Sequence, residues 1–191
     1  MGIGENTVMI VDVAMLIPRK QPMDALKAFK RLSDAGLDVA LYFLGNGEMR
    51  QEMESFISEH QLLNVHLTGI LPLGEVAKYL AAADIYLMAS EHDASPKALN
   101  EAMNFALPIV VSDGVETLDL LLAEGENGYS FPVGNVDVLA SALERVIRYE
   151  HRREMGEASA RIVARYDFER VADSWMQAVE YAVEKGSIKA S

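Results

Sequence analysis

The sequence predicts an α/β fold: a doubly wound, Rossmann-like parallel sheet of about six strands with helices on both faces, in a single domain over residues 1–191. Strand-like and helix-like segments alternate along the chain, and the strand segments are apolar throughout instead of at every second residue. The composition, with 50% hydrophobic residues, is that of an ordinary globular domain. Ligands of such sheets bind beyond the carboxyl ends of the strands.

The first half of the chain alternates strictly between strands and helices. The expected strands are 7–16, 38–44 and 64–69, and the expected helices are 22–36, 48–60 and 73–83. In the first of these helices, Leu26, Phe29 and Leu32 recur at helical spacing, and Gly36 stands at its end. Each strand is followed by a segment long enough for a crossover helix, which is the connection that parallel strands need.

The second half continues the pattern and ends in helices. The expected strands are 84–90, 108–112 and 128–131, and the expected helices are 96–106, 116–124, 135–149, 151–164 and 168–184. The segments that directly follow strands are the candidates for function, because the carboxyl ends of parallel strands share one edge of the sheet. Those segments are 14–20, 45–47, 69–71, 90–96 and 112–116.

Composition excludes several classes of function. The net charge is −12, from 29 acidic against 17 basic residues, and a field of that sign repels nucleic acid and anionic lipid. The chain has no cysteine and no His, Asp and Glu cluster at metal-ligand spacing, so we expect no metal. The stretch GNGEMR has Arg50 where a dinucleotide fingerprint has its third glycine, which argues against an NAD site. With no apolar run of membrane-span length and no signal peptide, we expect a cytoplasmic protein.

The stretch EHDASPKALNEAM, residues 91–103, combines two acids with a helix start. Ser95 is a suitable N-cap and Pro96 suits the first helical position, so unpaired N–H groups should point back toward the strand ends. That geometry binds anions. The residues also allow a simpler interpretation, a capped helix with Lys97 and Glu101 paired on its surface.

An ordered series of segments is similar to the retaining glycosyltransferases of the GT-B fold, particularly glycosyltransferase family 4. The pair Asp93 and Glu101, followed by EAMNFALPIVVSD, resembles the E-x7-E region of that family. The other matching segments are 15–32, 43–53, 64–90, 125–143 and 166–182. The likeness covers nearly the whole chain, about residues 8 to 184.

The resemblance implies a role for each residue at the acidic pair. Glu101 would bind the ribose hydroxyls of a nucleotide-sugar donor, and Asp93 would contact the hydroxyls of the transferred sugar. Lys20 matches the lysine that binds the donor diphosphate. The backbone after the first acid would face the sugar and diphosphate; these residues are Ala94, Ser95, Pro96 and Lys97.

The sequence departs from the family pattern at the other basic position. Met15 stands where the family has an arginine, and Arg19, the neighbour of Lys20, is the candidate replacement. The loop 114–119 also lacks the usual glycine pair. The turn containing Gly45 and Gly47 matches a segment near which the base is held.

The function that the resemblance implies is retaining hexosyl transfer from a nucleotide-diphosphate sugar to a glycan or lipid acceptor. The donor would be a UDP- or GDP-sugar, with no cofactor and no metal. The acceptor would be bound by an N-terminal domain missing from this chain, to which the helix 168–184 would cross back. We expect the chain alone to be inactive, and the longer protein to contact the inner face of the membrane at most peripherally.

Two other functions are compatible with the same residues. Met15 and the altered 114–119 loop would suit a non-catalytic GT-B-like module that binds a nucleotide or a partner protein. An epimerase or phosphorylase domain of the same fold is a third alternative.

Overall fold

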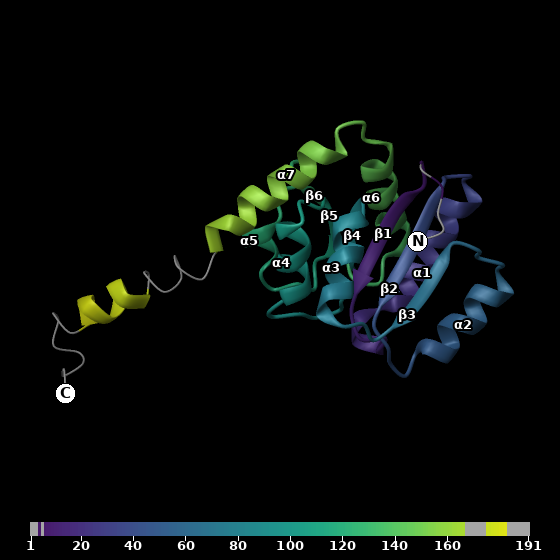
Figure 1. Ribbon diagram of the computed structural model, residues 1–191, viewed down its shortest axis with the longest axis horizontal. Coiled ribbons are helices and arrows are strands. Elements are labelled where there is room, and N and C mark those ends of the chain that lie inside the picture. The colour runs from purple at the N-terminus through teal and green to yellow at the C-terminus, as the bar shows by residue number, and fades with distance from the viewer. Residues whose placement is uncertain (1–3, 5, 167–174, 183–191) are drawn as a thin grey trace.

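The computed structural model describes residues 4, 6–166 and 175–182, and it confirms the predicted fold class. Six strands form one parallel sheet in the order β3-β2-β1-β4-β5-β6 (Figure 1). The strands are β1 Val8–Val13, β2 Val39–Leu44, β3 Val65–Gly69, β4 Ile85–Met88, β5 Ile109–Ser112 and β6 Gly128–Phe131. This order is that of the doubly wound dinucleotide-binding sheets.

The helices fall where the periodicity places them, with one marked difference. They are α1 Pro22–Asp34, α2 Arg50–Glu59, α3 Leu73–Ala82, α4 Lys97–Asn104, α5 Leu118–Leu121, α6 Val136–Arg148 and α7 Arg152–Val163, with 3₁₀ turns η1 Pro18–Lys20 and η2 Ala164–Tyr166. Of the helix predicted over 116–124, only the single turn of α5 is present, because the backbone is already extended at Leu122. Residues 175–182 are helical, but the rest of the helix predicted over 168–184 lies outside the described residues.

Two apolar layers sandwich the sheet, because successive residues of each strand face opposite sides. One layer joins Val8 and Ile10 of β1 to the buried faces of α1, α2 and α6. The other joins Met9 and Val11 to α3, α4, α5 and the end of α7. Strands covered on both faces explain the continuous apolar runs in the sequence.

The order of the strands reverses beside β1, which pairs in parallel with both β2 and β4. The chain leaves β1 toward β2 and β3 and later returns to add β4, β5 and β6 on the other side. In open sheets of this kind, ligands bind beyond the carboxyl ends of the strands where the order reverses, which here means the ends of β1 and β4; we call this place the crevice. In the described part of the chain, no helix is long and apolar enough to cross a membrane.

Candidate functional site

The loops after β1 and β2 are packed directly on each other at the carboxyl edge of the sheet. The Leu16 N–H donates to the Asn46 carbonyl at 3.1 Å, and the Leu16 carbonyl accepts from the Met49 N–H at 3.0 Å. A Cβ atom on Gly47 would lie 2.2 Å from the Leu16 carbonyl oxygen, and one on Gly45 would lie 1.9 Å from a carbonyl oxygen of the same loop. The two glycines are therefore required for close packing of the backbone.

The acidic loop after β4 is held from both sides by backbone hydrogen bonds. On one side the Glu91 N–H donates to the Arg19 carbonyl at 2.8 Å. On the other side the Asp93 N–H donates to the Gly114 carbonyl at 3.1 Å, and the Asp93 carbonyl accepts from the Glu116 N–H at 3.0 Å. The tertiary fold thus brings together three loops, those after β1, β4 and β5, around Asp93.

Lys20 and Asp93, predicted separately from the sequence, form an ion pair. The Lys20 Nζ lies 2.5 Å from the Asp93 Oδ2, and each side chain is only 14% exposed. The second carboxylate oxygen, Oδ1, accepts a hydrogen bond from the Ser95 N–H at 3.0 Å. Burial by itself raises the pKa of Asp93, but the hydrogen bonds from Lys20 and Ser95 and the charge of Arg19 outweigh it, so this pKa lies below its ordinary value.

Arg19 lies at the same loop. Its Nη1 donates to the His92 carbonyl oxygen at 2.5 Å, and its charge acts on Asp93. Met15, at the position where the family has an arginine, is 62% exposed. Arg19 therefore supplies a cation near the acidic loop from a different point of the β1 loop than Met15.

The start of α4 differs from the prediction. Ser95 is not the N-cap; Pro96 occupies that position, and no side chain caps the helix. The Lys97 N–H donates to the Ser95 carbonyl at 2.9 Å, the Ser95 N–H is held by Asp93, and proline has no N–H. Among the predicted anion-binding N–H groups, only that of Ala94 has no hydrogen-bond partner among the described residues. The Asp93 carboxylate itself supplies the anion that the prediction assigned to a ligand.

Glu101 is exposed on α4, and no ion pair joins it to Lys97 among the described residues. The simpler interpretation as a surface pair is therefore wrong for these two side chains. Glu101 is nevertheless close enough to the buried Tyr86 of β4 for its charge to act on that side chain, together with the charges of Asp12 and Asp93. Burial and those three carboxylates, in the order Asp12, Glu101 and Asp93, raise the pKa of Tyr86 well above its ordinary value.

Asp12 is a site residue that the motif comparison missed. It is 3% exposed in β1, on the central strand beside the crevice. Burial raises its pKa to about 7, against the opposing charge of Lys20. The sequence did contain a signal for this residue. The strand VMIVDV is otherwise apolar, and it has no residue of opposite charge that could pair with the acid.

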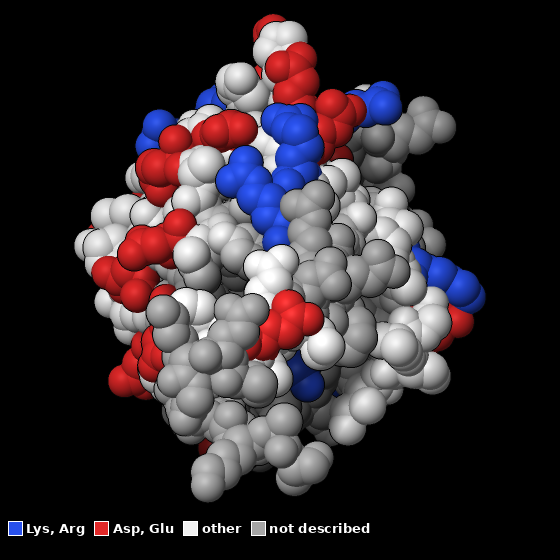
Figure 2. Space-filling model, turned by 90° about the vertical axis from the view of Figure 1, so that its left-hand side faces the viewer, with Lys and Arg blue, Asp and Glu red and all other residues white. Residues whose placement is uncertain are grey.

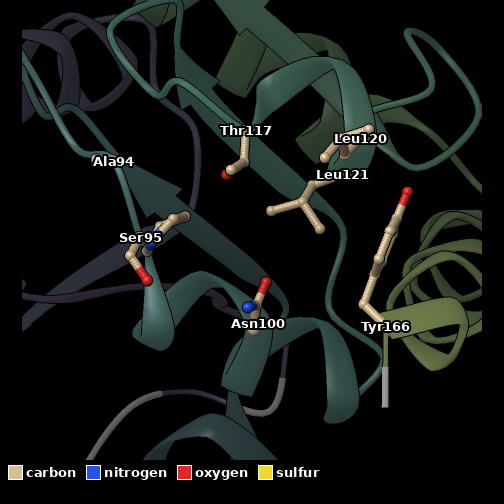
Figure 3. A pocket seen from close by; sticks show the side chains of 8 residues that line it. Ala94, Ser95, Asn100, Thr117, Leu120, Leu121 and Tyr166 are labelled. Carbon is tan, nitrogen blue, oxygen red and sulfur yellow. The ribbon is translucent and has the colours of Figure 1, made fainter. Parts of the chain in front are cut away.

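A pocket of about 190 Å³ opens on the other side of the acidic loop, between α4, α5 and η2 (Figure 3). Its lining residues are Ala94, Ser95, Pro96, Asn100, Thr117, Leu120, Leu121 and Tyr166. Asn100 and Thr117 point into it from opposite sides, and neither was selected from the sequence. Both side chains carry a buried oxygen without a hydrogen-bond partner in the described structure.

The charges on this side of the molecule are mixed. On the side where α4, α5 and α7 lie in Figure 1, acidic side chains surround a short band of Lys and Arg (Figure 2). Within the described residues there is no group of three or more His, Asp and Glu side chains that could hold a metal ion. Lys20 and Arg19 are cations that contact the acidic loop directly.

Comparison with protein-family models matches residues 2–162 to the family described as "Glycosyl transferases group 1". Among curated relatives, the amylovoran biosynthesis glycosyltransferase AmsK of Erwinia amylovora is 30% identical over 148 residues, which is 74% of this chain and 36% of that protein. The phosphatidyl-myo-inositol mannosyltransferase of Mycobacterium leprae is 30% identical over 174 residues, 89% of this chain and 45% of that protein.

A similar fold occurs in the pneumococcal O-GlcNAc transferase GtfA, solved in complex with UDP and GlcNAc. The TM-score is 0.82 at 19% sequence identity, over 94% of this chain and 37% of that one. This chain therefore spans between 36% and 45% of the length of these three proteins.

Proposed function

The chain belongs to the group 1 glycosyl transferases, and from that premise we propose that it is the donor-binding domain of a longer, two-domain glycosyltransferase. The proposed reaction is retaining transfer of a hexosyl group from a nucleotide-diphosphate sugar to a glycan or lipid acceptor. The names of two relatives support both kinds of acceptor, glycan and lipid, since one acts in polysaccharide synthesis and another on a phosphatidylinositol.

The observation that carries the proposal is the anion held at the carboxyl edge of the sheet. Lys20 Nζ and the Ser95 N–H bind the Asp93 carboxylate, and the charge of Arg19 acts on it. Groups that bind a carboxylate in this way also bind a phosphate oxygen, with stronger charge-assisted hydrogen bonds because the diphosphate carries more charge. In our proposal the donor diphosphate replaces the Asp93 carboxylate as the partner of Lys20. The displaced carboxylate then accepts hydrogen bonds from the hydroxyls of the sugar.

Glu101 completes the donor site in this proposal. Its exposed carboxylate, one turn into α4, accepts hydrogen bonds from the ribose hydroxyls, while the diphosphate lies toward Lys20 and Arg19. The remaining N–H of Ala94 is available to the sugar phosphate. The turn at Gly45 and Gly47 brings the backbone close enough to form the wall against which the base lies.

In the proposed transfer, the bond between the anomeric carbon and the β-phosphate oxygen breaks. A bond from that carbon to the acceptor oxygen forms on the same face, and the acceptor proton passes to the departing diphosphate. The charge that develops on the diphosphate is stabilised by Lys20 and Arg19, without a resident metal or cofactor. In this proposal the acceptor is bound by the second domain of the longer protein. We place that protein in the cytoplasm, with at most peripheral contact to the inner face of the membrane.

Isothermal titration calorimetry with UDP, UDP-glucose and GDP-mannose tests the proposal. UDP is the first nucleotide to try, because the pneumococcal transferase with the same fold was solved with it. We expect weak binding that Glu101→Ala weakens further by about 10- to 100-fold, since hydrogen bonds to a charged group contribute roughly 1.5–3 kcal/mol. Glu59→Ala, an exposed acid at the far end of α2, is the matched control and should bind as the unmodified chain does.

A non-catalytic binding module is the second candidate, favoured by Met15 and by the pairing of Lys20 with the chain's own Asp93. The decisive measurement is hydrolysis or transfer of the sugar by the longer protein. If the longer protein binds a nucleotide but turns over none of these donors, the module replaces the enzyme as our conclusion. If no nucleotide binds at all, even to the longer protein, the enzyme proposal fails and a module that binds a partner protein replaces it.

A further inference from the structure

The pocket between α4, α5 and η2 contains two polar atoms with nothing to bond to. The Asn100 Oδ1 and the Thr117 Oγ1 are buried and have no hydrogen-bond partner among the described residues. Thr117 precedes α5 directly, but its hydroxyl does not cap that helix. Buried polar groups are nearly always satisfied in folded proteins, so two orphans that line one pocket indicate a missing partner.

The two atoms differ in what they offer. The Asn100 Oδ1 is an acceptor and needs an N–H or O–H donor, whereas the Thr117 hydroxyl can donate to a carbonyl oxygen. They face the pocket from opposite sides, Asn100 from α4 and Thr117 from the start of α5 (Figure 3). A ligand group that satisfies both at once carries a donor and an acceptor pointing in opposite directions, as a secondary amide does.

The rest of the lining is mostly apolar, apart from the hydroxyl groups of Ser95 and Tyr166. Pro96, Leu120 and Leu121 supply aliphatic surface, and the ring of Tyr166 stands at one end (Figure 3). The volume of about 190 Å³ is roughly that of six water molecules, at about 30 Å³ each, which exceeds the volume of an acetamido group and leaves room for part of a sugar ring. The methyl of an acetamido group would displace water from this apolar wall.

We propose that this pocket selects a donor whose transferred sugar carries an acetamido group, an N-acetylhexosamine. The amide N–H donates to Asn100 Oδ1, the amide carbonyl accepts from the Thr117 hydroxyl, and the methyl packs against Leu120 and Leu121. This assignment rests on the proposed donor site, because the same loop, Ala94 to Pro96, lines the pocket and faces the donor sugar in that proposal.

A hydroxyl-bearing hexose fits the same space less well. A single hydroxyl at the corresponding carbon can serve both protein atoms only where both lie within reach of one oxygen, whereas an amide presents its donor and its acceptor on separate atoms. The hydroxyl also leaves the apolar wall uncovered. Sites that hydrogen-bond a particular group discriminate strongly against ligands that lack it, because their own buried polar atoms are then left unpaired. Asn100 and Thr117 are therefore specificity-determining residues in this proposal.

Titration of the chain with N-acetylglucosamine 1-phosphate and glucose 1-phosphate tests the inference independently of the base, with chemical shifts in NMR spectra as the readout. UDP-N-acetylglucosamine and UDP-glucose form a second pair. We expect the acetamido compound of each pair to bind about 10- to 100-fold more tightly. Asn100→Leu and Thr117→Val should each reduce that preference, and the double variant should abolish it while the affinity for UDP stays the same.

Asn104→Leu, an exposed asparagine one turn further along α4, is the matched control and should keep the preference. Circular dichroism and the melting temperature of each variant check that the fold is intact. Equal affinity for both members of each pair, or a preference that survives the double variant, overturns the inference while UDP binding still upholds the donor site. Loss of binding to UDP, GDP and all the sugar phosphates instead overturns the proposed function on which the inference rests.

Discussion

The two sides of the loop before α4 are built on opposite principles. Toward the crevice, the polar groups are already paired: Asp93 binds Lys20 and the Ser95 N–H, and Arg19 binds the loop carbonyl of His92. Toward α5, two buried oxygens, of Asn100 and Thr117, have no partner in the described structure. Ser95 contributes to both sides, because its N–H pairs with Asp93 and it also lines the pocket.

The difference teaches two ways in which a protein prepares a binding site. On the crevice side the chain supplies its own anion, so a ligand must exchange with Asp93 and the groups that receive it are held in position beforehand. On the pocket side no protein group of the described structure pairs with the two oxygens, so a ligand that pairs with them displaces no side chain. Substitutions of the paired groups on the crevice side should therefore weaken donor binding. Substitutions of the unpaired oxygens on the pocket side can leave the stability of the ligand-free chain unchanged.

The largest effect is expected from Lys20→Met, which removes the cation of the paired side. UDP should bind about 10- to 100-fold more weakly, because a charge-assisted contact to the diphosphate is lost. Calorimetry at constant ionic strength measures the change. Lys78→Met, which removes an exposed cation paired only with Glu75 on α3, should leave the affinity unchanged. Equal affinities for UDP in the Lys20 and Lys78 variants would contradict the exchange of anions at Asp93.

Asp12→Asn should produce the next largest effect, on stability as a function of pH. The pKa of Asp12 is about 7 in the folded chain against an ordinary value of 3.8, so the folded state binds the proton more tightly. The acid therefore lowers the free energy of unfolding progressively as the pH rises from about 4 to about 7. Relative to the unmodified chain, the asparagine variant should gain roughly 2 to 3 kcal/mol between pH 5 and pH 8.

Urea unfolding at pH 5, 6, 7 and 8 measures this difference for the two proteins. Asp137→Asn, which changes a side chain that is 83% exposed, is the control for the loss of one negative charge, and its effect should vary little over the same range. A constant difference between the Asp12 variant and the unmodified chain would show that Asp12 is ionised throughout, and that the crevice is more polar than its burial implies.

The smallest effect is expected from Thr117→Val, on the side with unpaired oxygens. The valine keeps the shape and removes a hydroxyl that has no partner in the described structure, so the free energy of unfolding should stay the same or rise by up to about 1 kcal/mol. Thermal unfolding measures this, with Ser112→Ala as the contrasting variant. The Ser112 hydroxyl, which donates to the Ser90 carbonyl at 2.5 Å, is satisfied, so its loss should destabilise the chain.

The candidate site residues came mainly from the family resemblance, which named the acid pair, Lys20 and the glycines at 45 and 47. Strand ends meet at one edge of the sheet, and the structure brings Lys20 and Asp93 together there. The N-cap prediction at Ser95 was wrong for a physical reason: Asp93 captures the Ser95 N–H, and Pro96 takes the cap position. The capping preferences of single residues do not include such competition between neighbours.

The sequence by itself determined the strands and helices, the two buried faces of the sheet and the edge at which we expect ligands, because the hydrophobic period and the alternation of strand and helix can be read from short stretches of chain. The order of the strands came from the structure. Only the tertiary structure decided which groups became partners. Lys20 meets Asp93 across 73 positions, and Asn100 faces Thr117 across a pocket that neither segment forms alone. Pairing and burial depend on contacts between distant segments, and these contacts are what give Asp12 its raised pKa and leave two oxygens without partners.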